Sequence, residues 1–448
     1  MKLCFESLGC DKNLVDSEVM LGLLKKDGFT FTDEEADADI IVVNTCCFIH
    51  DAKQESINTL LSAAGYKKTG HLKALIAAGC LAERYADQIR KEMPEVDAVV
   101  GTTAYEKIVP VIREVLQKQE EQAQEPHVVC LDDLQALPLP EVDRVNTTGG
   151  YTTYLKIAEG CDKHCTYCII PKVRGDYRSV PMEHLLKEAA FLAEGGAKEL
   201  ILVAQETTVY GTDIYGVKKL PELLHGLCKI PGIKWIRILY CYPEEITEEL
   251  IDTIRDEPKI CHYLDMPIQH CADGLLKRMG RRTDEQELRD VISRLRTRIP
   301  DIALRTTLIT GFPGETEEDQ KKLAAFVSEE RFDRLGVFTY SKEEGTPAAK
   351  MKEQIPERVK KARRNEIMAL QQTISAENGR KRIGEVLDVL IEGSLPEDNI
   401  YLGRSYRDAP GVDGYVFVES EQPLLSGDMV RVEITAAKEY DLIGRQVE

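Results

Sequence analysis

The sequence predicts an α/β protein in three parts: an N-terminal doubly wound parallel α/β domain, a central open barrel of six β/α units, and a small C-terminal all-β barrel. Two observations support this fold class. Short apolar runs alternate with helical patterns through most of the chain, which is typical of parallel strands joined by helices. After about Ser375 the helical patterns give way to short β-runs separated by glycines, which indicates an all-β module.

Length and composition agree with a multidomain globular protein. A chain of 448 residues exceeds one ordinary core. Hydrophobic residues make up 43% and charged residues 30%, and no stretch approaches the roughly 20 apolar residues that a membrane span needs. Glu6 interrupts the first apolar run, so we expect no secretory leader there. We therefore expect a cytoplasmic protein without membrane insertion.

The first domain is expected over residues 1–118. Its apolar runs read as strands, and the helical patterns between them read as the crossover helices of a parallel sheet. The expected strands are 2–8, 40–44, 72–77 and 98–100, with helices that include 17–26 and 51–64.

A connecting segment is expected over residues 119–150, because 117–124 is polar and 137–150 contains prolines. The central barrel follows over residues 151–374. A closed barrel of eight units usually needs about 250 residues, so this segment predicts an open barrel of six units. Its expected strands are 154–158, 199–204, 235–240, 262–266, 303–309 and 334–338.

The tail, residues 375–448, is expected to form the small β-barrel. Four short β-runs are punctuated by Gly393, Gly411, Gly414 and Gly427. Such runs, of even spacing and with glycine turns, are typical of a compact barrel of roughly 70 residues. The expected strands are 386–392, 400–405, 415–419 and 429–435.

Three cysteines carry the clearest chemical signal. Cys161, Cys165 and Cys168 stand in CxxxCxxC spacing directly after an expected strand. Thiolates suit iron-sulfur clusters, and a cubane with three protein ligands leaves its fourth iron open. The alternative is zinc, which normally needs a fourth ligand and paired CxxC spacing. We favour the iron-sulfur cluster.

A second set follows from the first domain, where Cys10, Cys46 and Cys80 each come after an expected strand. Parallel strands that end in cysteine gather these residues at one edge of the sheet. A single buried cysteine is usually a small packing residue. Three at equivalent positions predict a second metal cluster instead.

Three further segments lie where barrel strands end, which is where barrel enzymes place working residues. Gln205 and Glu206 follow the second strand, and His270 follows the fourth. A histidine there is more often structural than catalytic. The segment 309–316 contains Gly311 and Gly314, and glycine permits close backbone approach to a ligand. A turn that leads into a helix start explains this segment equally well.

Together these motifs resemble the methylthiotransferases of the radical S-adenosylmethionine (SAM) superfamily, over nearly the whole chain. The resemblance implies two [4Fe-4S] clusters and S-adenosyl-L-methionine as cofactors, with Cys161, Cys165 and Cys168 generating a 5′-deoxyadenosyl radical that abstracts hydrogen from unreactive carbon. The residues that we expect to bind the cofactor are Tyr167, Gln205, Glu206, Gly311, Gly314 and Glu315.

In the family, Asn-Thr-Cys is typical of the second ligand of the N-terminal cluster, which matches Asn44, Thr45 and Cys46. Cys47 departs from the commoner pattern and is the alternative to Cys46 as the ligand of the iron. We prefer Cys46 because of its position in the motif.

The family has two branches, one acting on a transfer-RNA adenosine and the other on an aspartate β-carbon of a small-subunit ribosomal protein. Segments 7–18 (SLGCDKNLVDSE), 205–211 and 269–270 resemble the second branch, whereas the transfer-RNA branch usually has a GCQMN-like segment. Glu206 stands where aspartate is commoner. Small-subunit ribosomal protein twelve is the expected substrate, and a transfer-RNA adenosine is the alternative.

The tail resembles a TRAM domain, which is often an RNA-binding module. Residues 377–448 contain 8 Lys and Arg against 15 Asp and Glu, a net charge of −7, and the whole chain carries −19. An acidic surface suits a basic ribosomal protein better than phosphates. Arg404 and Arg407 leave local RNA contact open, although we do not favour it. Other expected partners are a reductant such as flavodoxin or ferredoxin and a sulfur source; a non-enzymatic metal-binding TRAM protein is a distant alternative.

Overall fold

The computed structural model describes residues 1–122, 127–139, 144–395 and 399–448. By compactness the chain forms two units, each described by itself below. The first comprises Met1–Thr147, Ala158–Val180 and Ser341–Ala349, and the second Thr148–Ile157, Pro181–Tyr340 and Lys350–Glu448. The expected connection over 119–150 includes 123–126 and 140–143, which lie outside the described residues. The domain bounds drawn from the sequence stay a prediction.

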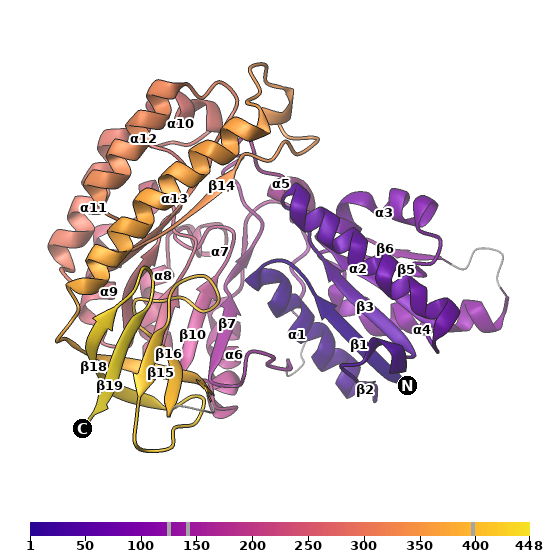
Figure 1. Cartoon of the computed structure of the whole chain (residues 1–448). Coiled ribbons are helices and arrows are strands. Elements are labelled where there is room, and N and C mark those ends of the chain that lie inside the picture. Colours follow the sequence, from indigo (N-terminus) through magenta and orange to yellow (C-terminus); the bar gives the residue numbers. More distant parts are fainter. Residues whose placement is uncertain (123–126, 140–143, 396–398) are drawn as a thin grey trace. The chain divides into compact units, whose positions relative to one another are not determined.

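In the described part of the first unit, six parallel strands form one sheet in the order β2-β1-β3-β4-β5-β6 (Figure 1). The central strands are buried on both faces, which is why they read as continuous apolar runs in the sequence. The strands are β1 (Lys2–Ser7), β2 (Thr30–Phe31), β3 (Ile40–Thr45), β4 (Ala74–Gly79), β5 (Ala98–Val100) and β6 (Val128–Cys130).

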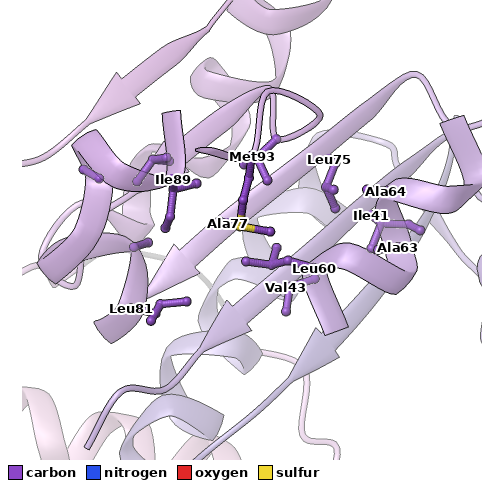
Figure 2. Packing of buried hydrophobic residues seen from close by; sticks show 14 of the residues in the cluster. Ile41, Val43, Leu60, Ala63, Ala64, Leu75, Ala77, Leu81, Ile89 and Met93 are labelled. Atoms are coloured by element: carbon purple, nitrogen blue, oxygen red, sulfur yellow. The ribbon is translucent and has the colours of Figure 1, made fainter. Parts of the chain in front are cut away.

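Alternate residues of this sheet pack against helices on opposite faces, so the expected doubly wound arrangement is confirmed. Ile41 and Val43 of β3 belong to a core shared with α2 and α3, which Figure 2 shows from close by. Ile40 and Val42 belong to a core shared with α1 and α4. The helices are α1 (Asp11–Lys26), α2 (His50–Thr69), α3 (Cys80–Glu92) and α4 (Ile108–Glu120), with 3₁₀ turns η1 (Glu35–Asp37) and η2 (Tyr105–Lys107).

The first unit also includes the segment that carries Cys161, Cys165 and Cys168. This segment contains β8 (Ala158–Glu159), α5 (Ile170–Val173) and β9 (Arg178–Ser179), and β8 pairs with β9 in antiparallel fashion. Ile169 and Val173 are buried in the same core as α2 and α3. The cysteine segment is therefore packed onto the core of the N-terminal sheet.

In the second unit, six described strands form a parallel sheet in the order β14-β13-β12-β11-β10-β7, as expected for an open barrel of six units. They are β7 (Thr152–Lys156), β10 (Glu199–Val203), β11 (Trp235–Ile238), β12 (Ile260–Asp265), β13 (Ala303–Thr310) and β14 (Arg334–Thr339). Its helices are α6 (Met182–Glu194), α7 (Thr212–Tyr215), α8 (Leu220–Cys228), α9 (Glu248–Asp256), α10 (Asp273–Met279), α11 (Glu285–Arg298), α12 (Glu317–Glu330) and α13 (Glu357–Arg380), with η3 (Pro243–Glu245). The turn η4 (Ala348–Lys350) ends where the first unit gives way to the second.

The tail closes into a β-barrel with the strand order β15-β16-β17-β19-β18, which confirms the expected all-β module. Its core consists of buried aliphatic residues such as Val389, Val416 and Val432. The strands are β15 (Val386–Leu395), β16 (Ile400–Ser405), β17 (Val416–Glu419), β18 (Met429–Ala437) and β19 (Leu442–Val447).

Five described strands were not expected from the sequence: the two-residue strands β8 and β9, and three others. β2 and β6 extend the first sheet at its two edges, and β19 closes the tail barrel between β17 and β18. β2 and β6 contain two and three residues. Runs this short carry almost no periodic signal, and strand pairing alone defines them.

Candidate cofactor sites

Three neighbouring strands of the first unit each lead into a cysteine. Cys10 precedes α1 after β1, Cys46 follows β3, and Cys80 is the first residue of α3 after β4. Because β1, β3 and β4 lie side by side and parallel, the three cysteines come to the same carboxyl edge of the sheet. The fold thus gathers residues that are separated by 35 and 33 intervening positions.

Two glycines allow these strand ends to approach closely. Gly9 has a φ of 90°, and a Cβ there would lie 2.7 Å from the Cβ and 3.0 Å from the Sγ of Cys46. Gly79 has a φ of 85°, and a Cβ there would lie 2.7 Å from the carbonyl oxygen of Thr45. Both positions combine a left-handed conformation with crowding, so a side chain at either one would push the cysteine loops apart.

Burial makes ionisation of the Cys46 and Cys80 thiols unfavourable without a nearby cation. It raises the pKa of Cys80 well above its ordinary value, and Arg174 opposes this shift only in part. Burial also raises the pKa of Cys46, and the negative charge of Cys10 adds to that shift. Thiolates that lie this close repel one another, and sulfur is a soft metal ligand. The set therefore fits an iron-sulfur cluster, because the positive charge of the iron stabilises the thiolates.

Cys47 has a different environment from Cys46. Its thiol is fully buried in the core shared with α2 and α3 and donates to the carbonyl oxygen of Cys80 over 3.2 Å. Burial raises the pKa of Cys47 to about 11. The side chain of Cys46 instead lies against the backbone of Gly9, beside Cys10. This contrast favours Cys46 as the ligand, and the choice stays a prediction.

The second cysteine set lies on the loop between β8 and α5. Cys161 and Cys165 are buried and Cys168 is half-buried. The backbone N–H of Cys168 donates to the carbonyl oxygen of Cys165 over 3.0 Å, which closes a turn around the loop. Gly160 has a φ of 74°, and a Cβ there would lie 1.9 Å from the carbonyl oxygen of Asp176. A glycine is therefore required where the loop begins.

Tyr167 is half-buried within this loop. Among the described residues, no three His, Cys, Asp or Glu side chains lie close enough together to hold a metal ion as they stand. The assignment of the six cysteines as iron ligands, and of Tyr167 as a cofactor contact, stays a prediction that rests on their placement.

Gln205 and Glu206 lie at the carboxyl end of β10 in the second unit, as the sequence predicts for barrel residues with a working role. Glu206 is buried, and its Oε1 accepts from the backbone N–H and the hydroxyl of Thr208. Both amide atoms of Gln205 are buried and have no hydrogen-bond partner among the described residues. A buried amide without partners is unfavourable by itself, and the expected role of Gln205 as a cofactor contact stays a prediction.

The segment 311–316 follows β13, and its glycines lie against side chains of the protein. Gly311 and Gly314 have φ values of 74° and 83°. A Cβ on Gly311 would lie 2.2 Å from Cγ of Lys360, and one on Gly314 would lie 2.2 Å from a guanidinium nitrogen of Arg278. The structural role expected from the sequence is thus present at both positions, and binding of the cofactor there stays a prediction.

Glu315 lies inside the segment 311–316 and stabilises its turn through hydrogen bonds. Its carboxylate accepts from the backbone N–H groups of Gly311 at 2.6 Å and Phe312 at 3.2 Å, and from Arg363 at 2.8 Å. Thr316 then caps α12 in a reciprocal capping box, as expected for a helix start. Burial raises the pKa of Glu315, while Arg363 and the two N–H groups lower it.

His270 follows β12 and is fully buried. Its Nδ1 accepts hydrogen bonds from the backbone N–H groups of Cys271 and Ala272, each over 3.0 Å. Burial lowers the pKa of His270 to about 4, so the ring is neutral and carries its proton on Nε2. Nε2 has no hydrogen-bond partner among the described residues.

The structure also reveals four buried polar residues that the sequence interpretation missed. Arg174 follows α5 and forms ion pairs with Glu159 and with Asp16 of α1, and it donates to Asn13. No local pattern links positions this far apart. The available signal was on α1, where Asn13 and Asp16 are polar residues spaced to share one face of the helix behind Cys10.

The tail arginines considered for RNA contact are turned inward in the second unit. Arg404 is fully buried and bonds to Glu199 of β10 and Glu392 of β15. Arg407 is 6% exposed and pairs with Asp333. These two side chains therefore bind the protein itself and do not offer a surface to RNA. None of the described helices combines the length and the apolar character that crossing a membrane requires.

Comparison with known families divides the chain into three matched segments. Residues 2–101 match the uncharacterized protein family UPF0004, residues 155–327 match the radical SAM superfamily, and residues 383–447 match the TRAM domain. The matched segments correspond to the cysteine-bearing sheet, to the cysteine loop with most of the barrel, and to the closed tail barrel.

Similar curated proteins span the whole chain. A protein of Lachnoclostridium phytofermentans is 63% identical over 99% of both chains, and one of Acetivibrio thermocellus is 52% identical over 98% of this chain and 97% of that one. Both are named ribosomal protein uS12 methylthiotransferase RimO. Among solved structures, the radical SAM methyltransferase TsrM from Kitasatospora setae has a TM-score of 0.55 at 12% identity and covers 92% of this chain and 81% of its own, which shows a shared fold.

Proposed function

This chain belongs to the RimO family of radical SAM methylthiotransferases, and we propose that it attaches a methylthio group to the β-carbon of an aspartate in ribosomal protein uS12. The observation that carries this proposal is structural. Both cysteine sets, one on the edge of the N-terminal sheet and one on the loop after β8, fall within the same compact unit. Radical generation and sulfur supply are thus assigned to a single body of the protein.

The cofactors are S-adenosyl-L-methionine and two [4Fe-4S] clusters, which we assign to Cys161, Cys165 and Cys168 and to the set of Cys10, Cys46 and Cys80. When bound, the first cluster supplies the electron that cleaves S-adenosyl-L-methionine, and the second holds or donates the sulfur. The protein binds and orients these cofactors, and it excludes water from them. Cys161, Cys165, Cys46 and Cys80 are each at most 6% exposed, so bulk water is kept from most of the ligand sulfurs.

Residues of the second unit supply the groups that we propose to contact S-adenosyl-L-methionine. The amide of Gln205 offers both a donor and an acceptor that no described residue uses. Glu315 and Arg363 hold the Gly311 turn in place, so the backbone there is preorganised. Glu206 and Gly314 complete the proposed contacts in this unit, and Tyr167 of the first unit is a further proposed contact.

A protein substrate is favoured over a transfer-RNA adenosine. The relatives' names refer to a ribosomal protein, and Arg404 and Arg407 are both engaged inside the second unit. The acidic tail, with its net charge of −7, suits a basic polypeptide. We further propose a reductant such as flavodoxin or ferredoxin, a separate sulfur source, and a cytoplasmic location. RNA contact has no support from these two arginines.

The test is mass spectrometry of ribosomal protein uS12 after anaerobic incubation with reconstituted enzyme, reductant, sulfide and S-adenosyl-L-methionine. The expected product is a methylthio group on one aspartate. Cys165→Ala should abolish both this product and 5′-deoxyadenosine. Cys228→Ala, at the end of α8 and outside either cysteine set, is the matched control and should leave both unchanged. A methylthio product on transfer RNA with none on uS12 would refute the proposed substrate.

A further inference from the structure

Asn13 contacts all three chain segments that carry the cysteines of the N-terminal set. It is fully buried on α1, one turn after Cys10. Its Nδ2 donates to the carbonyl oxygens of Leu8, two residues before Cys10, and Thr45, immediately before Cys46, each over 3.0 Å. Its Oδ1 accepts from the thiol of Cys80 at 3.7 Å. One side chain therefore ties the three cysteine loops together.

Arg174 fixes the orientation of this amide. Its Nη2 donates to Oδ1 of Asn13 at 2.5 Å and to Asp16 at 2.9 Å. A guanidinium can only donate, so the amide oxygen must face Arg174 and the NH₂ group must face the two carbonyl oxygens. A cysteine that ligates iron has lost its proton and no longer donates to Asn13. Arg174 is then the donor that keeps the amide from turning.

Arg174 also binds the chain segment just before the other cysteine set. Its Nη1 donates to both carboxylate oxygens of Glu159, at 2.9 and 2.7 Å, and Glu159 lies two residues before Cys161. Arg174 is 1% exposed, and both carboxylate partners are buried. Breaking such a buried network is costly because the remaining charges lose their partners. The network runs without interruption from Cys80 to the start of the Cys161 loop, within the first unit.

We propose that Asn13 is the positioning residue of the N-terminal cluster site, and that Arg174 positions Asn13 while it anchors the Cys161 loop. Groups that orient the ligands of a metal typically change its affinity by about 10- to 100-fold when they are removed. Loss of Asn13 should therefore weaken iron binding at the N-terminal cluster alone. Loss of Arg174 should change the properties of both clusters. This inference rests on the cluster assignment made above.

The first experiment isolates the N-terminal cluster by changing Cys161, Cys165 and Cys168 to alanine in the full chain. After anaerobic reconstitution with ferrous iron and sulfide, we measure iron loss to a chelator and the electron paramagnetic resonance spectrum of the reduced cluster. Asn13→Leu should lose iron about 10-fold faster and show shifted g-values. Asn13→Asp keeps the size but removes both N–H donors. It should give the same two changes, and it replaces the leucine variant if that variant folds poorly.

The matched control is Ser17→Ala, one turn further along α1. Ser17 is also buried, and its hydroxyl is hydrogen-bonded to Ser7, to Asn44 and to the backbone carbonyl oxygen of Asn13, but no hydrogen bond described in the structure joins it to a cysteine. Ser17→Ala should leave the iron loss and the spectrum unchanged. Equal behaviour of Asn13→Asp and Ser17→Ala would overturn the inference, since Asn13 would then be only a polar core residue.

The second experiment tests Arg174 with Arg174→Lys, which keeps the charge and loses the fork of donors. In the chain that lacks Cys161, Cys165 and Cys168, this variant should reproduce the effect of Asn13→Asp. The double variant should show no larger effect than either single variant. With Cys10, Cys46 and Cys80 changed to alanine instead, Arg174→Lys should shift the spectrum of the remaining cluster and Asn13→Asp should not. A shift by both variants, or by neither, would contradict the assigned roles. If the chain that lacks Cys161, Cys165 and Cys168 binds no cluster even with Asn13 intact, the cluster assignment itself fails.

Discussion

At the scale of single residues, the unpartnered amide of Gln205 has a measurable thermodynamic signature. A buried amide without partners lowers the folding stability of the cofactor-free protein by about 1–3 kcal/mol. Gln205→Leu should therefore raise the stability of the protein alone by about 1 kcal/mol and weaken binding of S-adenosyl-L-methionine. Thermal unfolding and calorimetric titration measure the two effects. Gln371→Leu is the contrast, because that amide donates to Phe332 and Ser375, and its loss should destabilise the protein.

His270 predicts a pH effect at the same scale. Burial holds its pKa near 4, below the value of about 6.5 in an unfolded chain. Between these values the unfolded chain binds the proton more readily, so stability is complete above pH 6.5 and is lost as the pH falls towards 4. The loss amounts to about 3 kcal/mol. Urea unfolding at pH 7 and pH 5 should show a steeper decline for the wild type than for His270→Gln. The control His71→Gln, at an exposed position, should follow the wild type.

At the scale of elements, Glu199 joins the barrel sheet to the tail barrel. It is the first residue of β10 and pairs with Arg237 of β11 at 2.9 Å and with Arg404 of β16 at 2.6 Å, all three fully buried. Burial alone would raise the pKa of Glu199, but the two guanidiniums outweigh it and lower the pKa to about 2. The pairing therefore stabilises the protein above about pH 4.5 and is lost as the pH falls from there towards 2.

Glu199→Gln should lower the stability of the second unit by about 3–5 kcal/mol at neutral pH, because two buried arginines lose their counter-charge. The variant should also lack the acid-dependent loss of the wild type between pH 4.5 and 2. Thermal unfolding across this pH range measures both effects. The comparison is Glu433→Gln, which removes an exposed ion pair with Arg445, and a similar loss there would contradict the argument.

Some elements and the residues that they position could be predicted from the sequence, and others could not. Cys10, Cys46 and Cys80 follow strands whose apolar runs are long enough to recognise, so their gathering at one sheet edge could be predicted. β6 could not, since Val128–Cys130 is a short run inside a polar stretch and only its pairing with β5 makes it a strand. Local RNA contact by Arg404 was left open because arginine is mostly exposed in proteins. Its burial depends on Glu199, which lies 205 positions earlier in the chain.

At the scale of the whole molecule, the net charge of −19 predicts a salt-sensitive reaction with a basic protein substrate. Attraction between exposed charges is screened over about 10 Å at 0.1 M salt and about 3 Å at 1 M. We expect kcat/KM for uS12 to fall about 10-fold over that range, mainly through slower association. Formation of 5′-deoxyadenosine without substrate should change little and serves as the internal control. Equal sensitivity of both reactions would argue against electrostatic steering.

The packing of the Cys161 loop onto the N-terminal core limits how members of this family can be recombined. Ile169 and Val173 are buried among residues of α2 and α3, and Arg174 bonds to α1. A chimera that exchanges only the first 147 residues would keep the old loop against a new core. Residues 158–180 and 341–349 would have to be inherited together with the N-terminal sheet. Crossovers placed at the boundaries of sequence families would separate side chains that fold as one body.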